Sequence, residues 1–335
     1  MNSYLKGLLC CLLATVSWGG MFPVMTHALT YIDPFNFTTF RYGIAGIAFA
    51  LLLLFREGQN SFRLKGERWG LAWLFGTLGF AGFAGFAGFA GFAGFAGFGF
   101  LVFLGQSLAG PGGALTASIM MATMPMLGLL TIWALKKVRP HASTMSFILL
   151  SFSGVVLVIT NGDVFAVLNS PISLAANLLL IAGALCWVLY TIGGSYFPGW
   201  SPLRYTTMTT LLGMISVVLI DLFLVGSGAI SVPSAASIIT IVPHLFYMAL
   251  VAGLVAVLCW NVGNRIITPT NGVLFMDVVP ITAFIVSALN GVVPTNMQII
   301  GAVITAMALV LNNLNQRKLA MLATQANTLK ASTSH

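Results

Sequence analysis

Long apolar runs alternate with short polar breaks along most of the chain. A helix that crosses a bilayer needs about 20 mainly apolar residues, and the breaks fall at charged residues or at clusters of Pro, Gly and Asn. The third run is unusual, because it is 40 residues long. The pattern predicts an all-α polytopic membrane protein with ten transmembrane helices, in rough terms Gly7 to Ala28, Phe35 to Phe55, Trp69 to Leu108, Ala114 to Leu135, Ala142 to Thr160, Ser173 to Gly194, Tyr205 to Val225, Val242 to Val262, Gly272 to Asn290 and Met297 to Leu314.

Composition supports this prediction. Of the 335 residues, 59% are hydrophobic and 6% are charged, whereas a soluble domain is about 25% charged. So few charged side chains cannot cover a water-soluble body, which excludes a soluble single core. The net charge of +8 does not indicate nucleic acid as a partner, because the basic residues form no continuous stripe.

The basic residues give an orientation. Thirteen of the 14 Lys and Arg residues fall in connections on one side of the predicted spans, and the other, Arg41, lies inside the second span. Short loops rich in Lys and Arg stay cytoplasmic, so both termini are expected in the cytoplasm. The third run must then cross an odd number of times, most simply once. No Ala-x-Ala-like site closely follows the first run, so we expect it to be retained as a span.

The two halves of the chain resemble each other. The matched landmarks are Trp18 and Trp187, Pro34 and Pro202, Pro125 and Pro280, and the segments that begin at Gly154 and Ala306. Their spacings are 169, 168, 155 and 152 residues, and the fall coincides with six Phe-Ala-Gly triplets from Phe80 to Gly97. Five spans per half is an odd number, which predicts two inverted repeats with a substrate site between them. We expect a first repeat at 1–160, a second at 161–318 and a polar cytoplasmic tail at 319–335.

The triplets resemble an insertion. The counterpart of the third run, Val242 to Val262, is about 21 residues long, so roughly four or five triplets are surplus by length as well as by offset. A Phe at every third residue slips around the helix by about 60° each time, so the tract specifies no face. We expect the extra residues to lengthen the third span beyond the bilayer or to form an added excursion.

Several of these motifs together resemble a known family. They are Ser17-Trp18-Gly19 with Pro23, Asp33-Pro34 followed by Arg41, Ala117-Ser118 leading to Pro125, and the Gly154 segment. The chain resembles drug/metabolite transporters of the EamA type over about residues 5 to 318, apart from the triplets. Within that superfamily it is most similar to bacterial exporters of aromatic and other neutral amino acids. The resemblance implies a ten-helix carrier in the inner membrane of a bacterium, with no bound cofactor.

Two tryptophans are candidates for binding the substrate. Trp usually lies at the membrane interface, but Trp18 and Trp187 lie near the middle of their spans. They can stack on an aromatic substrate, with the hydroxyl of Tyr190 one turn beyond Trp187, or they can serve helix packing alone. Trp260 is nearer a span end and is interpreted as an interfacial residue.

Ionisable residues inside spans are functional candidates. Arg41 can contact a substrate carboxylate or extend outward to solvent. Asp277 can receive an amino group or a proton, or can cap backbone groups freed by a nearby kink. Asp221, His27 and His244 lie close enough to span ends to be solvated, and no role is given to them.

Prolines inside spans leave carbonyl groups unpaired, which indicates either hinges around a cavity or packed kinks. These prolines are Pro23, Pro125 and Pro280. Weaker candidates for the cavity lining are Ser118, Met121 and Asn264.

The leading hypothesis is a carrier that exports aromatic or neutral amino acids by alternating access, as a uniporter or with weak proton coupling. A carrier for another small metabolite or a drug is the alternative within the same class. An intramembrane enzyme or lipid-handling protein is less favoured, because the sequence shows no nucleophile and base set, metal-ligand cluster or phosphate loop. The expected partners are a small-molecule substrate and the lipid bilayer, without nucleic acid, and a monomer is possible.

Overall fold

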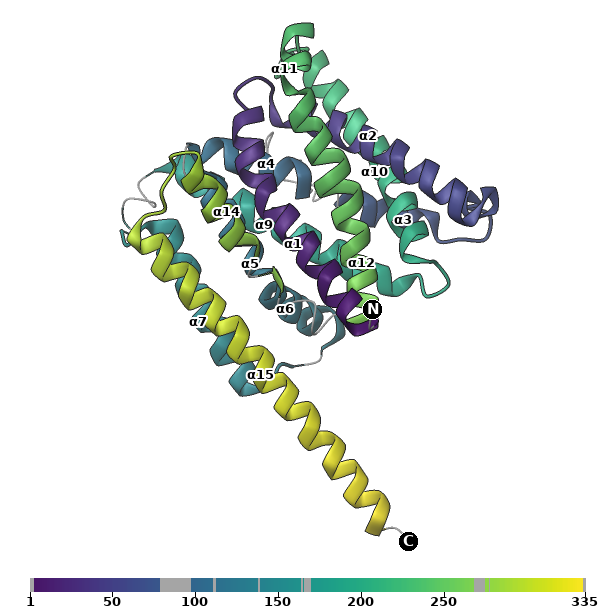
Figure 1. Cartoon of the computed structure of the whole chain (residues 1–335), viewed down its shortest axis with the longest axis vertical. Coiled ribbons are helices and arrows are strands. Elements are labelled where there is room, and N and C mark those ends of the chain that lie inside the picture. The colour runs from purple at the N-terminus through teal and green to yellow at the C-terminus, as the bar shows by residue number, and fades with distance from the viewer. Residues whose placement is uncertain are drawn as a thin grey trace.

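A computed structural model of the chain describes residues 3–78, 98–110, 113–137, 139–163, 165, 170–267, 275–276 and 278–333. This part of the chain is helical and contains no β-strand. Figure 1 shows the helices assembled around α1. Their bounds are α1 Ser3–Ala28, α2 Pro34–Glu57, α3 Trp69–Gly76, α4 Phe98–Leu108, α5 Gly113–Ala122, α6 Met124–Lys136, α7 Ala142–Thr160, α9 Pro171–Gly193, α10 Pro202–Gly226, α11 Ala235–Phe246, a π-helical segment η5 Tyr247–Val255, α12 Ala256–Ile267, α14 Val278–Leu289 and α15 Asn296–Thr333, with short 3₁₀ turns η1 Gln59–Phe62 and η4 Gly194–Tyr196.

The prediction of an all-helical membrane protein is confirmed. Six helices in the described part of the chain are long and apolar enough to cross a membrane, and the bent pair α5 and α6 would make a seventh. Shorter apolar helices are α4, α14 and the first part of α15. Helical structure lies in all ten predicted ranges, while the number of ten complete spans stays a prediction.

Local signals in the sequence explain where the helices begin. The Asp33 carboxylate accepts hydrogen bonds from the backbone N–H groups of Phe35 and Asn36, and Pro34 occupies the first turn of α2. At the matching place in the second half, Ser201 caps α10 and a proline follows it. Side-chain oxygens satisfy backbone donors that have no intrahelical partner, and proline is tolerated there because its missing N–H is not needed.

The helix contacts are nearly the same when the two halves are exchanged. α1 packs against α12, and α9, the counterpart of α1, packs against α4. Counterparts also contact each other directly, as in the pairs α2 with α10, α5 with α14, and α7 with α15. The pair of α7 and α15 lies side by side along one edge of the molecule in Figure 1. Two repeats related by a two-fold axis would produce a contact pattern of this kind.

Glycines allow some of the closest helix crossings. A Cβ atom added at Gly154 of α7 would lie 2.6 Å from the carbonyl oxygen of Gly301 in α15. One added at Gly301 would lie 2.5 Å from the carbonyl oxygen of Gly154. Neither position can carry a side chain unless the facing helix moves. In lipid, where apolar side chains gain little from leaving the solvent, small residues of this kind let helices pack closely.

The eighth predicted span is longer than expected. The helix runs over Ala235–Ile267, 33 residues, instead of about 21. Ser234 caps its start by accepting a hydrogen bond from the Ser237 backbone N–H, and Pro243 lies within the helix without ending it. The length of this helix therefore does not indicate four or five surplus triplets, and the offset between the repeats alone indicates them. The triplets themselves, Phe80 to Gly97, lie outside the described residues.

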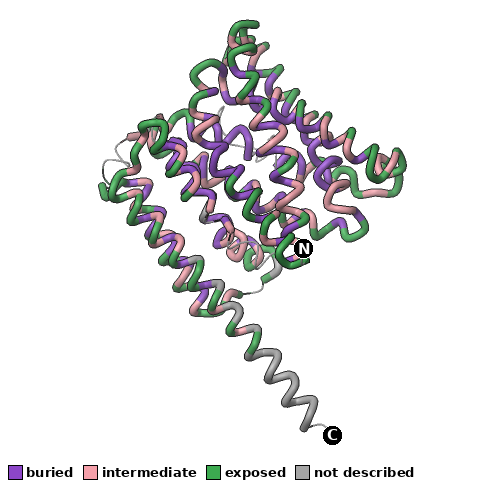
Figure 2. Tube along the Cα trace, in the orientation of Figure 1, coloured by how far each residue is buried: buried purple, intermediate pink, exposed green. Residues whose placement is uncertain are grey.

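Buried residues concentrate where helices meet around α1, as Figure 2 shows. Apolar side chains are also exposed on outer surfaces, among them Leu149 of α7, Ile285 of α14 and Val303 of α15. Exposed apolar side chains on several helices suit a body surrounded by hydrocarbon, since lipid does not penalise them.

Candidate functional site

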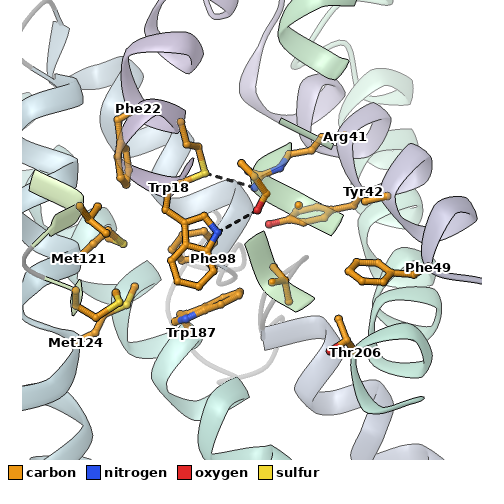
Figure 3. A pocket seen from close by; sticks show the side chains of 17 residues that line it. Trp18, Phe22, Arg41, Tyr42, Phe49, Phe98, Met121, Met124, Trp187 and Thr206 are labelled. Carbon is orange, nitrogen blue, oxygen red and sulfur yellow. Dashed lines mark hydrogen bonds between the residues drawn. The ribbon is translucent and has the colours of Figure 1, made fainter. Parts of the chain in front are cut away.

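A central cavity lies where helices of both halves meet α1 (Figure 3). The space open to the centre of a water molecule is about 40 Å³. The cavity is therefore nearly closed by its own side chains, and a larger molecule needs them to move. Its lining is formed by Trp18, Met21, Phe22, Arg41, Tyr42, Ala45, Phe49, Phe98, Met121, Met124, Trp187, Thr206, Ala252, Gly253, Val257, Met276 and Val279.

Aromatic rings form one wall of this cavity. The Trp18 and Trp187 rings meet edge to face, with centroids 6.0 Å apart. Phe98 packs on Trp187 with a centroid distance of 5.0 Å. Trp260 lies on the other side of Trp18, at 5.3 Å. An aromatic guest can take part in such a cluster, because edge-to-face and offset contacts are favourable among rings.

The π-helical segment fixes the orientation of Trp18. Its indole Nε1 donates a hydrogen bond to the carbonyl oxygen of Ala252 at 3.0 Å. In an α-helix that oxygen would accept from the N–H of Ala256, but this N–H bonds instead to the carbonyl oxygens of Val251 and Gly253. The local widening thus takes the Ala256 N–H away from this oxygen, to which a side chain of the first half donates, and π-helical turns are often found at functional sites.

Arg41 projects into the cavity from α2, on the side away from Trp187 in Figure 3. Its side chain is buried, with an exposed fraction of 3%. The Nε atom donates to the carbonyl oxygen of Met248 at 3.0 Å, and Nη2 contacts the sulfur of Met21 at 3.4 Å. The guanidinium also lies 4.9 Å from the ring centroid of Tyr42 and 5.2 Å from that of Phe103.

A second cavity, which we call the vestibule, adjoins the first. Its space for water centres is about 190 Å³. Trp187 and Val257 line both cavities, so the Trp187 ring is part of the partition between them. The vestibule extends to the connection between α9 and α10, next to Arg204. Because of this basic residue, the connection is expected on the cytoplasmic side. Its other lining residues are Tyr190, Thr191, Gly194, Phe197, Trp200, Ser201, Pro202, Tyr205, Trp260 and Asn261.

At the opposite end, polar contacts join α1 to its neighbours. The Gln106 side-chain amide of α4 donates to the carbonyl oxygen of Phe22 at 2.7 Å and to the hydroxyl of Thr26 at 2.8 Å. The imidazole rings of His27 in α1 and His244 in α11 share a hydrogen bond of 2.8 Å. These contacts hold α1, α4 and α11 together between the cavity and the loops on the side opposite the vestibule.

The structure divides the predicted site residues into two groups. Trp18, Trp187, Arg41 and Met121 line the central cavity together, and Tyr190 lines the vestibule instead.

The remaining candidates lie elsewhere. Ser118 and Asn264 line neither cavity. The buried Ser118 hydroxyl donates to the carbonyl oxygen of Leu115, and the Asn264 amide donates to the carbonyl oxygen of Trp260 on its own helix. Asp277 lies outside the described residues.

The three predicted hinge prolines differ from one another. Pro23 lies within α1, which continues as one helix to Ala28. Pro125 follows the break between α5 and α6, where the two axes differ by 47°. Pro280 is buried in the first turn of α14. A bend that accompanies a proline is therefore seen at Pro125, next to the cavity residue Met124.

Distance to a span end proves a poor guide for Trp260 and Asp221. Trp260 lies farther from the helix end than the sequence predicts, because the helix continues to Ile267, and its ring packs against Trp18. Asp221 is buried rather than solvated, with an exposed fraction of 9%. The sequence suggests no role for His27 and His244, although they bond to each other across two helices.

Several lining residues are not apparent from the sequence argument. Met21 lies three residues after Trp18, and Met124 lies three residues after Met121. Helical spacing from a predicted site residue is therefore a usable signal for both. No such signal exists for Ala252, because it contributes a backbone oxygen to the Trp18 hydrogen bond and not a side chain.

The lining of the central cavity has the chemistry of a binding site. It is aromatic and methionine-rich with one cation, and the described part of it includes no carboxylate or imidazole. Among the described residues, no group of three His, Cys, Asp or Glu side chains could hold a metal ion.

Comparisons with known proteins agree on the type of protein. The model of the EamA-like transporter family matches residues 5–160 and again residues 174–314. The chain is 40% identical over 313 residues to the uncharacterized transporter YrdR of Bacillus subtilis (strain 168), covering 93% of this chain and 92% of that protein. It is 25% identical over 289 residues to the uncharacterized transporter YyaM of the same organism, covering 85% and 86% of the two chains. A solved crystal structure of a protein shares the fold with a TM-score of 0.61 at 18% identity, over 95% of this chain and 98% of the other.

Proposed function

This chain belongs to the EamA-like transporter family, and we propose that it exports aromatic and other neutral amino acids through the central cavity by alternating access. In this proposal the two halves of the chain are inverted repeats, at 1–160 and 161–318, that rock about the cavity between them. The protein would act in a bacterial inner membrane with both termini in the cytoplasm, as the distribution of basic residues suggests.

The observation that supports this proposal most is the pair Trp18 and Trp187. They come from matching positions of the two halves, and their rings meet at 6.0 Å on one wall of the cavity. A flat aromatic side chain that enters between them would replace the contact between the two tryptophan rings by two contacts, one with each ring. Movement of one half against the other would change the Trp pair, and with it the affinity for the ring.

The two ends of the cavity support alternating access. Towards the basic loops, only side chains such as Trp187 separate the cavity from the roomier vestibule. Towards the opposite loops, the Gln106 and His27 contacts tie α1 to α4 and α11. The arrangement corresponds to a carrier that is closed on the outer side and loosely closed on the inner side.

Coupling to an ion has little support from the lining. The described lining residues include no carboxylate, which proton-coupled carriers commonly use. A uniporter or a weakly proton-coupled carrier therefore fits best. On sequence grounds Asp277 remains our candidate for receiving the amino group of the substrate.

Flux in proteoliposomes tests the proposal. The purified protein should release preloaded radiolabelled phenylalanine or tryptophan faster than protein-free liposomes do. Trp18→Ala should reduce this flux to near background, because the ring wall is lost. Trp133→Ala is the matched control, since Trp133 is exposed on α6 and lines neither cavity. No flux above empty liposomes for any neutral amino acid would contradict the proposal.

A carrier for another small metabolite or a drug is the second candidate. It is favoured by the methionines of the lining, Met21, Met121, Met124 and Met276. Methionine is flexible and polarisable, so a lining rich in it adapts to different shapes. A panel of unlabelled competitors in the same assay separates the candidates, because a drug carrier would be inhibited by aromatic compounds that lack the amino-acid group.

A further inference from the structure

Arg41 is a buried cation with an unused donor group. It is 3% exposed, and its Nη1 atom has no hydrogen-bond partner among the described residues. Its Nε is satisfied by the Met248 carbonyl oxygen, while Nη2 meets only a thioether sulfur. Sulfur is a weak acceptor, so one full edge of the guanidinium fork lacks a strong acceptor. That edge belongs to a side chain that lines the central cavity.

The described residues also supply no negative charge to this cation. Among them, the ion pair found joins Arg204 to Glu67, at the loop end of α10. The carboxylate of Glu57 accepts from the Ser201 hydroxyl, and that of Asp33 caps α2. A buried charge without a counter-ion is costly, and such residues in membrane proteins usually face a ligand or an ion pathway.

The surroundings limit which anion would fit. Arg41 stands beside the aromatic rings of Tyr42 and Phe103, and the opposite wall is formed by Trp18 and Trp187. A guanidinium edge binds a carboxylate through two parallel hydrogen bonds. A phosphate dianion would keep a second negative charge that one cation does not neutralise, which is costly in a buried site. The complementary ligand is therefore a monocarboxylate joined to an aromatic or apolar body.

We propose that Arg41 is the specificity-determining residue of the cavity, that it binds the carboxylate of the cargo, and that the carrier rejects amines and organic cations that lack a carboxylate. This inference rests on the proposed function in that it takes the central cavity as the transport site. It also narrows the second candidate function, a carrier for another small metabolite or a drug, because the charge of Arg41 would repel a cationic drug.

Two matched compounds test this proposal on the unmodified protein. 3-Phenylpropionate and phenethylamine carry the same ring and two-carbon chain, and one ends in a carboxylate while the other ends in an ammonium group. 3-Phenylpropionate should inhibit phenylalanine flux at a concentration about tenfold or more below that of phenethylamine, as expected for one added hydrogen-bonded ion pair. Equal inhibition by the two compounds would overturn the proposal.

Variants locate the effect at Arg41. Arg41→Gln should remove the preference for 3-phenylpropionate. Arg41→Lys should still prefer 3-phenylpropionate, but less strongly, because lysine keeps the charge but not the bidentate edge. Preference retained in Arg41→Gln would overturn the assignment. Thermal unfolding of each purified variant reports folding, and if Arg41→Gln does not fold, Arg41→Lys together with the unmodified protein still decides the question.

A binding measurement separates failure of this inference from failure of the proposed function. Quenching of tryptophan fluorescence by 3-phenylpropionate and by phenethylamine needs no transport. If phenylalanine is not carried but the carboxylate still binds more tightly in an Arg41-dependent way, the proposed cargo is wrong and the carboxylate site stands. If phenylalanine is carried and the two probes bind equally, the cargo stands and the role of Arg41 is wrong.

Discussion

The Trp18 indole Nε1 lies 3.0 Å from the carbonyl oxygen of Ala252, so a cavity ring of the first half is oriented by the backbone of the second half. Their separation in the sequence is 234 residues. Any displacement of one half against the other must break this hydrogen bond or carry the ring along with it. The cavity wall is thereby coupled to the relative position of the two halves.

Replacing the donor while keeping a ring tests this coupling. Trp18→Phe should lower stability by about 0.5–1.5 kcal/mol, because the buried hydrogen bond to the Ala252 oxygen is lost. Thermal unfolding in detergent measures the loss, and Trp133→Phe serves as the control. Phenylalanine flux should survive in part, since a ring still lines the wall. Unchanged stability would indicate that the hydrogen bond contributes nothing.

The crossing of α7 and α15 should not tolerate a side chain. Gly154→Leu should destabilise the protein by about 1–3 kcal/mol or more through overpacking against Gly301. The yield of monodisperse protein and its unfolding temperature report this. Gly226→Ala is the control, because a Cβ atom there meets nothing within 4 Å. Since α7 and α15 contribute no residue to the described cavity lining, the KM of the surviving protein should not change.

Loosening the outer contacts should expose the outer side of the cavity. Gln106→Leu removes the hydrogen bonds to Phe22 and Thr26, which favours the outward-open state in our proposal. The test places a cysteine at Met25, which is fully buried, in a chain whose four native cysteines are replaced by serine. Membrane-impermeant maleimide added outside should label Met25→Cys faster when Gln106→Leu is present. Equal rates would show that these contacts do not close the outer side.

Charge at Arg41 should make exchange faster than net efflux. An empty carrier would have to reorient with a buried cation that has no counter-ion among the described residues, whereas a loaded one carries the carboxylate with it. Unlabelled phenylalanine outside the proteoliposomes should therefore accelerate release of labelled phenylalanine several-fold. Acceleration of the same size in Arg41→Gln would contradict this explanation.

The triplet tract should be dispensable. Deleting five of the six Phe-Ala-Gly triplets shortens the third predicted run from 40 to 25 residues, still long enough to span a bilayer. Phenylalanine flux should stay the same or improve. Complete loss of flux from a deletion variant that folds, as judged by its unfolding temperature, would show that the tract has a function.

The sequence predicts the cavity in part, and the physical reasons differ from residue to residue. Trp18 and Trp187 are recognisable because tryptophan at mid-depth is unusual and the repeat matches them, and Arg41 because a charge inside a span is unusual. Ser118 is misleading, because polarity does not indicate which face of a helix a residue occupies. Ala252 could not be predicted, because it contributes a backbone oxygen and the π-helical widening around it leaves no mark in hydropathy.

The widened turn at Tyr247–Val255 has a consequence for the whole eighth span. Each extra residue accommodated there rotates everything after it by about 100° relative to an unbroken α-helix. The apolar stripes of α11 and α12 therefore cannot be aligned on a single helical wheel. Deleting one residue, for example Leu254, would shift the phase of α12 and turn Val257 and Trp260 away from the cavities they line. The number of residues in this segment, and not only their identity, is thus part of the specificity of the binding site.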